Sequence, residues 1–299
     1  MKIYDDVLVA AEYPFAVYSR VTREKLPFNY QAYPSCYPVQ PVAHEHGDCF
    51  WLEQDQDANV GHFFMDTSHM ILDWRPGWTI LCRDVSFVRE LITLWRPAAA
   101  FVPLVLDHSL HHIKRLRRPD RLFRHSLRVI PPQVLYFFME LRCKAPTVMN
   151  PVPLVMITRR GDWRRALPQE DELIEGMVKL GFVPYQFNKF SLVERISLIR
   201  QARCVFSHCG AGATHYAFIA PGATTITLYS PTLHGEEQHN SRLTRAMGGV
   251  PYVLDENGQS FSNQVNADGA AVGGDHSAPW ALPSVPVILD AVKRIVDAI

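Results

Sequence analysis

The sequence predicts an α/β fold in two domains, and three observations support this. Short apolar runs alternate with segments of helical periodicity from about residue 153 to 228, which is the strand and helix order of a parallel sheet. A chain of 299 residues with 47% hydrophobic residues can bury a large core in two domains. The prolines within residues 145–153 indicate a linker. We therefore expect two Rossmann-like domains.

The domain limits follow from these patterns. The predicted units are an N-terminal domain at 1–145, a linker at 146–153, a second domain at 154–279 and a C-terminal helical segment at 280–299. Packing of that last segment back on the first domain is one option. In the first domain we expect strands at 7–10, 79–82 and 102–106, and a helix at 86–95 capped by Ser86. Residues 134–141 fit a strand or a helix.

The second half is easier to interpret. Residues 154–157 form an apolar run that is too short for a helix and ends in Thr158, Arg159 and Arg160, as buried parallel strands do at their carboxyl ends. Acidic residues open the helix that follows, at the positive end of its dipole. Further strands are predicted at 182–185, 204–207 and 252–254, and helices at 170–180, 191–201, from about 213, 241–247 and 285–299.

The polar strand ends in this half form a candidate anion site. Arg159 and Arg160 follow one strand, and Gly210, Ala211 and Gly212 follow another. Glycine lets backbone amides approach a phosphate, a helix start directs its amides toward it, and guanidinium groups add charge-assisted hydrogen bonds. The alternative is that the arginines are solvated loop residues and the glycines only turn the chain.

A second candidate site lies in the first half. His62, Asp66, His69 and Asp73 would share one face of an α-helix. An imidazole beside a carboxylate is typical of a general base. Two alternatives stay open. One is a metal site of His62, Asp66 and His69, which folding could complete with His44 and His46, and the other is a structural polar face.

Composition narrows the class of protein. The formal charge is zero, so no nucleic-acid partner is expected. The six cysteines have no paired spacing and indicate reduced, buried thiols. No apolar run is long enough to span a membrane, and Asp5 and Asp6 interrupt any leader, so we expect a cytoplasmic protein. The basic run from Lys114 to Arg128 is either a solvated face or a contact surface for a phosphate-bearing acceptor, a membrane surface or nucleic acid. Its lack of interleaved aromatic residues favours the first.

Several motifs together resemble a known family. They are Ile157-Thr-Arg-Arg160, the acidic helix start Glu170-Asp-Glu-Leu173, the run Cys209-Gly-Ala-Gly-Ala-Thr-His215, and Phe218-Ile-Ala-Pro-Gly222. Their order and spacing resemble the donor-side half of glycosyltransferase family 61, which includes transferases of the capsular polysaccharide, xylosyl and N-acetylglucosaminyl types. The segment from His62 to Asp66 is similar to a His-x-x-x-Asp helix in the N-terminal half of that family.

The resemblance implies a GT-B fold, with two Rossmann-like domains facing a cleft, and an inverting hexosyl- or pentosyltransferase. The donor would be a nucleotide sugar of the UDP type, and the acceptor a glycan hydroxyl. His62 or Asp66 would be the base. Donor contacts would come from Arg159, Arg160, His208, Cys209, Gly210, Ala211, Gly212, Thr214 and Glu237. No cofactor or metal is expected, because arginines and helix amides can neutralise the diphosphate.

Two positions depart from the family pattern. Cys209 stands where histidine usually precedes Gly-Ala, and Thr227 stands where a glutamate is usual. His208, His215 or Glu237 would then substitute in the donor site, or catalysis is lost. Two other function classes therefore stay open: a non-catalytic saccharide- or nucleotide-binding protein of the same fold, and a metal-dependent hydrolase that uses His62, Asp66 and His69.

Overall fold

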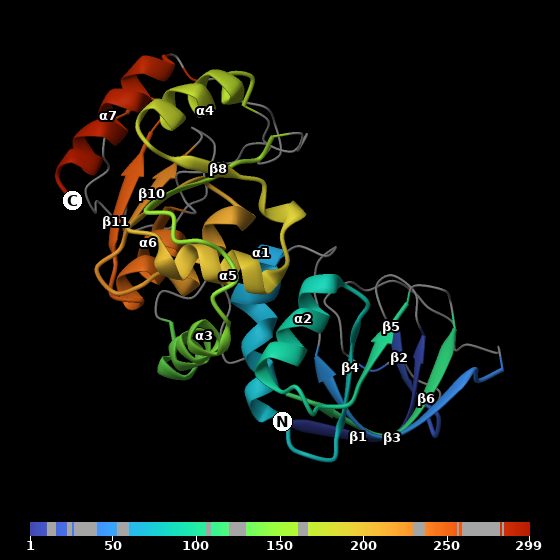
Figure 1. The fold of residues 1–299 in the computed structure, drawn as a ribbon. Helices are drawn as coiled ribbons and strands as arrows, with labels where there is room; N and C mark the ends of the chain where they lie inside the picture. The colour runs from blue at the N-terminus through green and yellow to red at the C-terminus, as the bar shows by residue number, and fades with distance from the viewer. Residues whose placement is uncertain are drawn as a thin grey trace. The chain divides into compact units, whose positions relative to one another are not determined.

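The computed structural model contains two sheets and helices, which confirms the mixed α/β prediction (Figure 1). It describes residues 1–10, 16–22, 26, 41–52, 60–105, 109–119, 130–160, 167–229, 237–255, 257–258, 282 and 284–299. Contacts divide the chain into two units, Met1–Arg124 and His125–Ile299. Each unit is described by itself.

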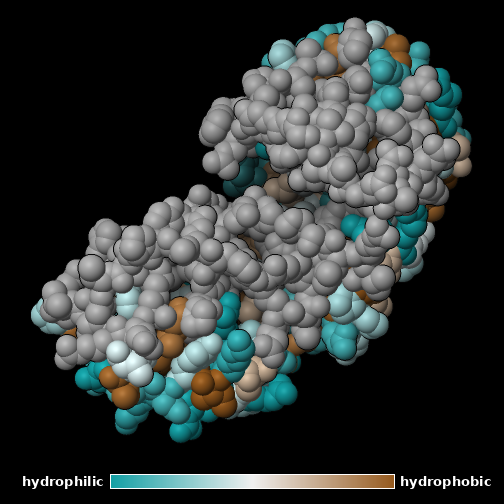
Figure 2. All heavy atoms as spheres, turned by 180° about the vertical axis from the view of Figure 1, so that it is seen from behind, coloured by the Kyte–Doolittle hydropathy of each residue, from teal (hydrophilic) through white to brown (hydrophobic). Residues whose placement is uncertain are grey.

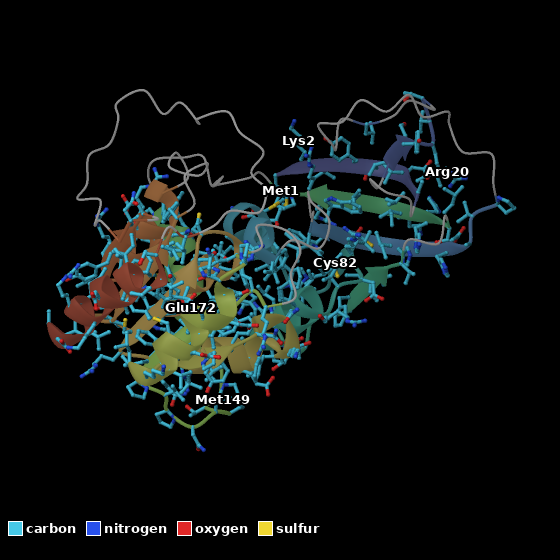
Figure 3. All side chains as sticks on the ribbon, turned by 90° about the horizontal axis from the view of Figure 1, so that it is seen from above. Met1, Lys2, Arg20, Cys82, Met149 and Glu172 are labelled. Carbon is cyan, nitrogen blue, oxygen red and sulfur yellow. The ribbon has the colours of Figure 1, made fainter. Side chains whose placement is uncertain are left out.

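The first unit is built on a six-stranded sheet of order β2-β1-β6-β3-β4-β5. Its strands are β1 (Lys2–Ala10), β2 (Ala16–Ser19), β3 (His44–Leu52), β4 (Thr79–Arg83), β5 (Phe101–Leu104) and β6 (Leu110–Arg118). The strands from β3 to β6 pair in parallel, whereas β1 runs antiparallel to both β2 and β6. The sheet is therefore mixed, not purely parallel as the alternation of elements suggested. Figure 3 views it from above, with Lys2 labelled at the start of β1 and Arg20 labelled just after β2.

Apolar side chains from neighbouring strands form the core of this unit. Val7, Cys49, Trp51, Leu81 and Ile113 are among its buried members. Helix α2 (Ser86–Trp95) buries one stripe, Phe87, Val88, Leu91, Ile92 and Trp95, at the spacing of an amphipathic helix. The predicted serine cap is wrong, because Val85 holds the cap position and Ser86 is already helical.

The segment from Val60 to Asp73 is not the regular α-helix that the sequence suggested. It consists of α1 (Val60–His62), a π-helical stretch η1 (Phe63–Thr67) and a 3₁₀ stretch η2 (Ser68–Asp73). The hydroxyls of Thr67 and Ser68 donate to the carbonyl oxygens of Phe63 and Phe64, at 3.1 and 2.9 Å. Such bonds compete with the helical backbone ladder. The backbone of this segment is therefore not the regular α-helix on which His62, Asp66, His69 and Asp73 were expected to share a face.

The second unit holds a five-stranded parallel sheet of order β11-β10-β9-β7-β8. Its strands are β7 (Leu154–Ile157), β8 (Val183–Tyr185), β9 (Cys204–His208), β10 (Thr224–Leu228) and β11 (Val250–Leu254). In chain order the second strand lies on one side of the first, and the third to fifth lie on the other. This is a doubly wound order, and the point where it reverses lies between β7 and β9.

Helices cover both faces of this sheet (Figure 1). They are α3 (Pro132–Lys144), α4 (Glu170–Lys179), α5 (Leu192–Gln201), α6 (Glu237–Ala246) and α7 (Val285–Asp297), with the 3₁₀ stretches η3 (Phe187–Lys189) and η4 (Ala211–Phe218). On one face α4 and α7 join the strands in a core that includes Met156, Leu173, Phe206, Ile288 and Val292. On the other face, η4 contacts α3, α5 and α6.

Local sequence signals explain several of these helices. Ser191 and Glu194 form a capping box at the start of α5, because the Glu194 amide donates to Ser191 Oγ at 3.3 Å and the Ser191 amide donates to Glu194 Oε2 at 2.7 Å. Gly176 on α4 lets Leu289 of α7 approach the helix backbone, since a Cβ there would overlap that side chain. The C-terminal helix thus belongs to the core of the second unit.

Helix α3 also belongs to the second unit, so the division lies earlier than the predicted linker at 146–153. Phe138 of α3 packs edge-on against Phe218 of η4, with ring centroids 5.9 Å apart. Arg200 of α5 donates to the carbonyl oxygens of Arg142, at 3.0 Å, and of Ala145. These contacts satisfy carbonyl groups at the end of α3 that the helix itself leaves without partners.

The coloured surface in Figure 2 is mainly hydrophilic, with hydrophobic residues dispersed in it. Large apolar side chains that are exposed include Ile3, Val21, Tyr136, Met139 and Val287. Single exposed apolar side chains of this kind are common on protein surfaces. None of the helices in the described ranges is long and apolar enough to cross a membrane.

Candidate functional site

The candidate site lies at the reversal point of the second sheet. Strands β7 and β9 are adjacent, with Ile157 paired to Ser207. The chain therefore leaves the carboxyl ends of both strands side by side, with Thr158 and Arg159 after β7 and with His208, the last residue of β9, leading into the Gly210 turn. Open α/β sheets bind ligands at this position.

Main-chain contacts fix the arginine pair that follows β7. The Thr158 amide donates to the Tyr185 carbonyl at 2.9 Å, and the Arg159 amide donates to Glu170 Oε1 at 2.7 Å. The Arg160 carbonyl accepts from Gln186 Nε2 at 2.7 Å. Two of these bonds involve β8 and the residue that follows it, and the third involves the start of α4. The residues after β7 are therefore held by both elements.

The glycines of the second strand end each have a structural reason. Gly210 has a φ of +135°, which side chains other than glycine rarely allow. At Gly212 a Cβ would lie 3.1 Å from Ile157 Cγ2 and 3.1 Å from Ser207 Oγ. The turn therefore packs directly on the ends of β7 and β9, and its backbone is partly exposed there.

The helix after this turn differs from the prediction. The sequence suggested an α-helix from about Ala213, but η4 is a 3₁₀ helix that begins at Ala211. The Thr214 hydroxyl donates to the Ala211 carbonyl at 2.6 Å, and His215 Nδ1 donates to the Gly212 carbonyl at 3.0 Å. Both bonds join residues three positions apart and so favour the tighter 3₁₀ turn.

Two histidines at this edge are buried and neutral near pH 7. Burial, with a smaller effect of the Arg159 charge, lowers the pKa of His208 to about 4. Burial and the Arg195 charge lower the pKa of His215 to about 3, against the opposing effect of its backbone hydrogen bonds. The His215 ring also packs edge-on against Phe187, with centroids 4.9 Å apart. Positive charge at the strand ends therefore comes from the arginines and not from these imidazoles.

The two departures from the family pattern have clear structural surroundings. The Cys209 side chain packs with Tyr229 and Val253, and its amide donates to the Leu228 carbonyl at 2.9 Å. The Thr227 hydroxyl donates to the Tyr216 hydroxyl at 3.3 Å, which in turn donates to the Ile226 carbonyl at 3.0 Å. Both side chains are thus in the interior of the second unit.

The structure brings some of the predicted donor residues together. Arg159 and His208 lie close enough for the arginine charge to affect the histidine pKa, and Gly212 packs on the ends of the same two strands. Arg160 lies beside Arg159 but pairs with Asp171, Nε to Oδ1, at 3.0 Å. Glu237 is the first residue of α6 and its side chain lies outside the described residues.

The first-half candidates are described only in part. The side chains of His62 and Asp66 lie outside the described residues, although their backbone falls in α1 and η1. π-helical stretches of this kind occur frequently at functional sites. His69 is fully buried. The assignment of His62 or Asp66 as the base stays a prediction.

His44 and His46 meet a different partner from the one considered for a metal site. The His46 Nε2 and His111 Nδ1 atoms are 3.1 Å apart, and the His44 and His111 rings stack with centroids 4.6 Å apart. Burial and the neighbouring histidines lower the pKa of His46. Within the described part of the chain, no three His, Cys, Asp or Glu residues are grouped to hold a metal ion.

The described part of the basic run is largely paired within the first sheet. Arg115 Nε lies 3.0 Å from Asp5 Oδ1, and Arg117 Nη2 lies 3.1 Å from Asp48 Oδ2. The Arg117 guanidinium also stacks on the Trp78 ring, 4.3 Å from its centroid. Residues 120–128 of the run lie outside the described residues.

Sequence patterns missed two residues at this edge, Glu170 and Gln186. Glu170 belongs to a run of three acids that suits any helix start, so only the fold distinguishes it from its neighbours. Gln186 follows a short strand and carries no motif. What they share is position. Glu170 begins α4, the helix that follows β7 in the chain, and Gln186 directly follows β8, the strand paired with β7.

Comparison with known proteins gives a family match over the middle of the chain. No curated protein matches it in sequence. The sequence model of the family described as Glycosyltransferase 61 matches residues 60–226, which is more than half of the chain and contains both candidate sites except for Glu237. Glycosyltransferase activity is what this family suggests. On the extent of that match, the chain belongs to glycosyltransferase family 61.

Proposed function

We propose that this protein is an inverting glycosyltransferase that moves a hexosyl or pentosyl group from a UDP-sugar to a hydroxyl of a glycan acceptor. One observation carries the donor half of the proposal. The family's motifs fall at the reversal point of the second sheet, with Arg159 after β7 and the Gly210 turn after β9. A diphosphate fits that position because it needs cationic side chains and accessible backbone amides.

The reaction follows from these assignments. The acceptor oxygen forms a bond to the anomeric carbon, the bond from that carbon to the diphosphate oxygen breaks, and its electron pair stays on the nucleoside diphosphate. The acceptor proton passes to a base, for which His62 or Asp66 is proposed. Attack opposite the leaving group inverts the anomeric configuration.

Charge stabilisation is assigned to the second unit. As the diphosphate leaves, it gains negative charge, which Arg159 and the amides from Gly210 to Gly212 would stabilise. His208 and His215 are neutral near pH 7 because burial lowers their pKa values. They can contribute hydrogen bonds there, but no counter-charge. The proposal needs no metal, because fixed cations and amides supply the positive potential.

The remaining features of the proposal follow the family or the sequence. A GT-B fold and a glycan acceptor are included on the first ground, and a cytoplasmic location is included on the sequence pattern. Reduced thiols are consistent with such a location, and burial raises the pKa values of Cys49, Cys82 and Cys204 to about 12. The expectation that the cysteines are buried is wrong for Cys143, which is exposed.

Donor binding is tested with a panel of nucleotide sugars by thermal shift and calorimetry. A UDP-sugar should raise the melting temperature, because it binds the folded state. Arg159→Ala should weaken its binding roughly 10- to 100-fold, the range for hydrogen bonds to a charged group. Arg203→Ala is the matched control, since this exposed arginine precedes β9 at the opposite edge of the sheet. Equal affinities in both variants would remove Arg159 from the donor site.

The base is tested by transfer kinetics. Asp66→Asn should slow transfer and leave UDP-sugar binding nearly unchanged, because an amide cannot support proton abstraction by the neighbouring imidazole. Asp73→Asn, at the end of η2, is the control. An active Asp66→Asn enzyme would assign the base elsewhere. Donor binding by wild type without any transfer would favour the non-catalytic binding protein, which is the competing function because Cys209 and Thr227 depart from the family pattern.

A further inference from the structure

We infer that Glu170 is a positioning residue for the donor site: its carboxylate holds the main chain at Arg159, and through it the direction in which the arginine leaves β7. The inference rests on the proposed function, since it concerns the same strand end. It assigns a role in transfer to a residue that touches neither the sugar nor the diphosphate in that proposal.

The contact itself is short and protected. Glu170 Oε1 accepts the Arg159 amide at 2.7 Å, and the Glu170 residue is only 8% exposed. Hydrogen bonds to an ionised acceptor are roughly twice as strong as neutral ones. The bond joins the first residue of α4 to the second residue after β7, so it fixes the strand end relative to the helix that follows it.

A role in helix stability alone does not explain this arrangement. Asp171 and Glu172 also lie in the first turn of α4, and both are exposed, which is sufficient for an interaction with the helix dipole. Figure 3 labels Glu172 on this helix. Glu170 is instead buried, and burial raises its pKa against the opposing effects of the Arg159 amide and charge. Burying a carboxylate costs free energy, and what this one gains is a fixed Arg159.

The two neighbouring arginines are thereby separated. Arg160 pairs with Asp171, and both side chains are more than 60% exposed, so this pair adds little stability. Gln186 holds the Arg160 carbonyl at 2.7 Å. Arg159 lies near His208, whose pKa its charge lowers. Holding the amide of Arg159 and the carbonyl of Arg160 fixes the backbone between them.

Three substitutions separate geometry from charge. Glu170→Gln keeps an acceptor oxygen at the same reach and removes the charge. Glu170→Asp keeps the charge and shortens the side chain, so that the oxygen no longer reaches the amide. Glu170→Ala removes both. If Glu170 acts by position, the dissociation constant for the UDP-sugar rises roughly 10-fold in the Asp and Ala variants and less than about 3-fold in the Gln variant. The acceptor KM stays unchanged.

The exposed neighbour supplies the control, because Glu172→Gln changes the same charge on the same helix turn and should leave donor binding unchanged. A double-mutant cycle tests the link to Arg159. The variant with both Arg159→Ala and Glu170→Ala should bind the donor no more weakly than Arg159→Ala alone, since positioning has no effect once the positioned side chain is gone. Melting temperatures identify any variant that fails to fold, and the Gln and Asp variants then decide the question.

The outcomes are distinct. Wild-type affinity in Glu170→Asp, or additive losses in the double variant, would overturn the positioning role while Arg159→Ala still supports the proposed function. If wild type binds no nucleotide sugar at all, the proposed function falls and the positioning role falls with it. The inference is supported if donor affinity falls in Glu170→Asp and Glu170→Ala but not in Glu170→Gln, and if Glu170→Ala causes no further loss when Arg159→Ala is already present.

Discussion

The two buried histidines of the second unit make its stability dependent on pH. His208 and His215 have pKa values of about 4 and about 3 in the folded protein, against an ordinary value of 6.5. The unfolded chain therefore binds protons that the folded chain does not. Stability is full above pH 6.5 and falls as the pH drops below it.

The size of the effect follows from these values. At pH 5 an unfolded histidine is almost fully protonated, while both folded imidazoles are still mainly neutral. Each histidine then lowers the free energy of unfolding by about 2 kcal/mol relative to pH 8, or about 4 kcal/mol together. This is a large part of the stability of a typical domain.

The assay compares chemical denaturation at pH 8 and pH 5 for wild type and His215→Leu. The variant loses the bond to the Gly212 carbonyl and is less stable at both values, but its change between the two pH values should be smaller than that of wild type by about 2 kcal/mol. All other titrating groups cancel in this comparison. Ile199→Val, a buried change in the same unit, should lower stability equally at both pH values. An identical pH dependence in His215→Leu and wild type would refute the assignment of a neutral buried imidazole.

Three further substitutions test the packing of the second unit. Gly176→Ala should lower the free energy of unfolding by about 1–3 kcal/mol, because its methyl group overlaps Leu289. Adding Leu289→Ala should restore part of that loss in thermal denaturation. No change in either variant would contradict the close packing of α4 on α7. Gly212→Ala should weaken UDP-sugar binding by calorimetry more than it lowers the melting temperature, since the turn must shift by a few tenths of an ångström, and unaltered binding would show that the turn tolerates a side chain. Arg200→Ala should lower the free energy of unfolding by about 1–3 kcal/mol through the loss of its bonds to the end of α3, whereas Arg203→Ala should not; equal values would mean that these bonds add no net stability.

Local patterns predicted the second sheet well. The strands at 154–157 and 204–207 and the helix that starts at Glu170 lie within a residue or so of β7, β9 and α4. Parallel strands buried on both faces are apolar over their whole length, and proline, glycine and acidic residues mark the helix ends, so each signal is contained in a few residues.

Features that depend on distant parts of the chain could not be predicted. The helical period from His62 to Asp73 gave no sign that Thr67 and Ser68 would bond to carbonyl groups four residues earlier and disturb the helix. Glu170 was one of three similar acids until the fold buried it next to Arg159. Burial is a property of the tertiary structure, and neither composition nor spacing contains it.

The place of α3 has a practical consequence for dissecting the molecule. Phe137 and Phe138 are fully buried, and Phe138 packs on η4, the stretch that follows the glycine turn. A fragment that starts at the proline-rich stretch near residue 146 would lack these rings and leave an apolar surface of η4 open to water. Its Arg200 side chain would keep the Thr147 hydroxyl but lose the carbonyl groups of Arg142 and Ala145. Isolating the second unit for crystallisation or ligand screening therefore requires a start before Pro132, so that the helix preceding the prolines is retained.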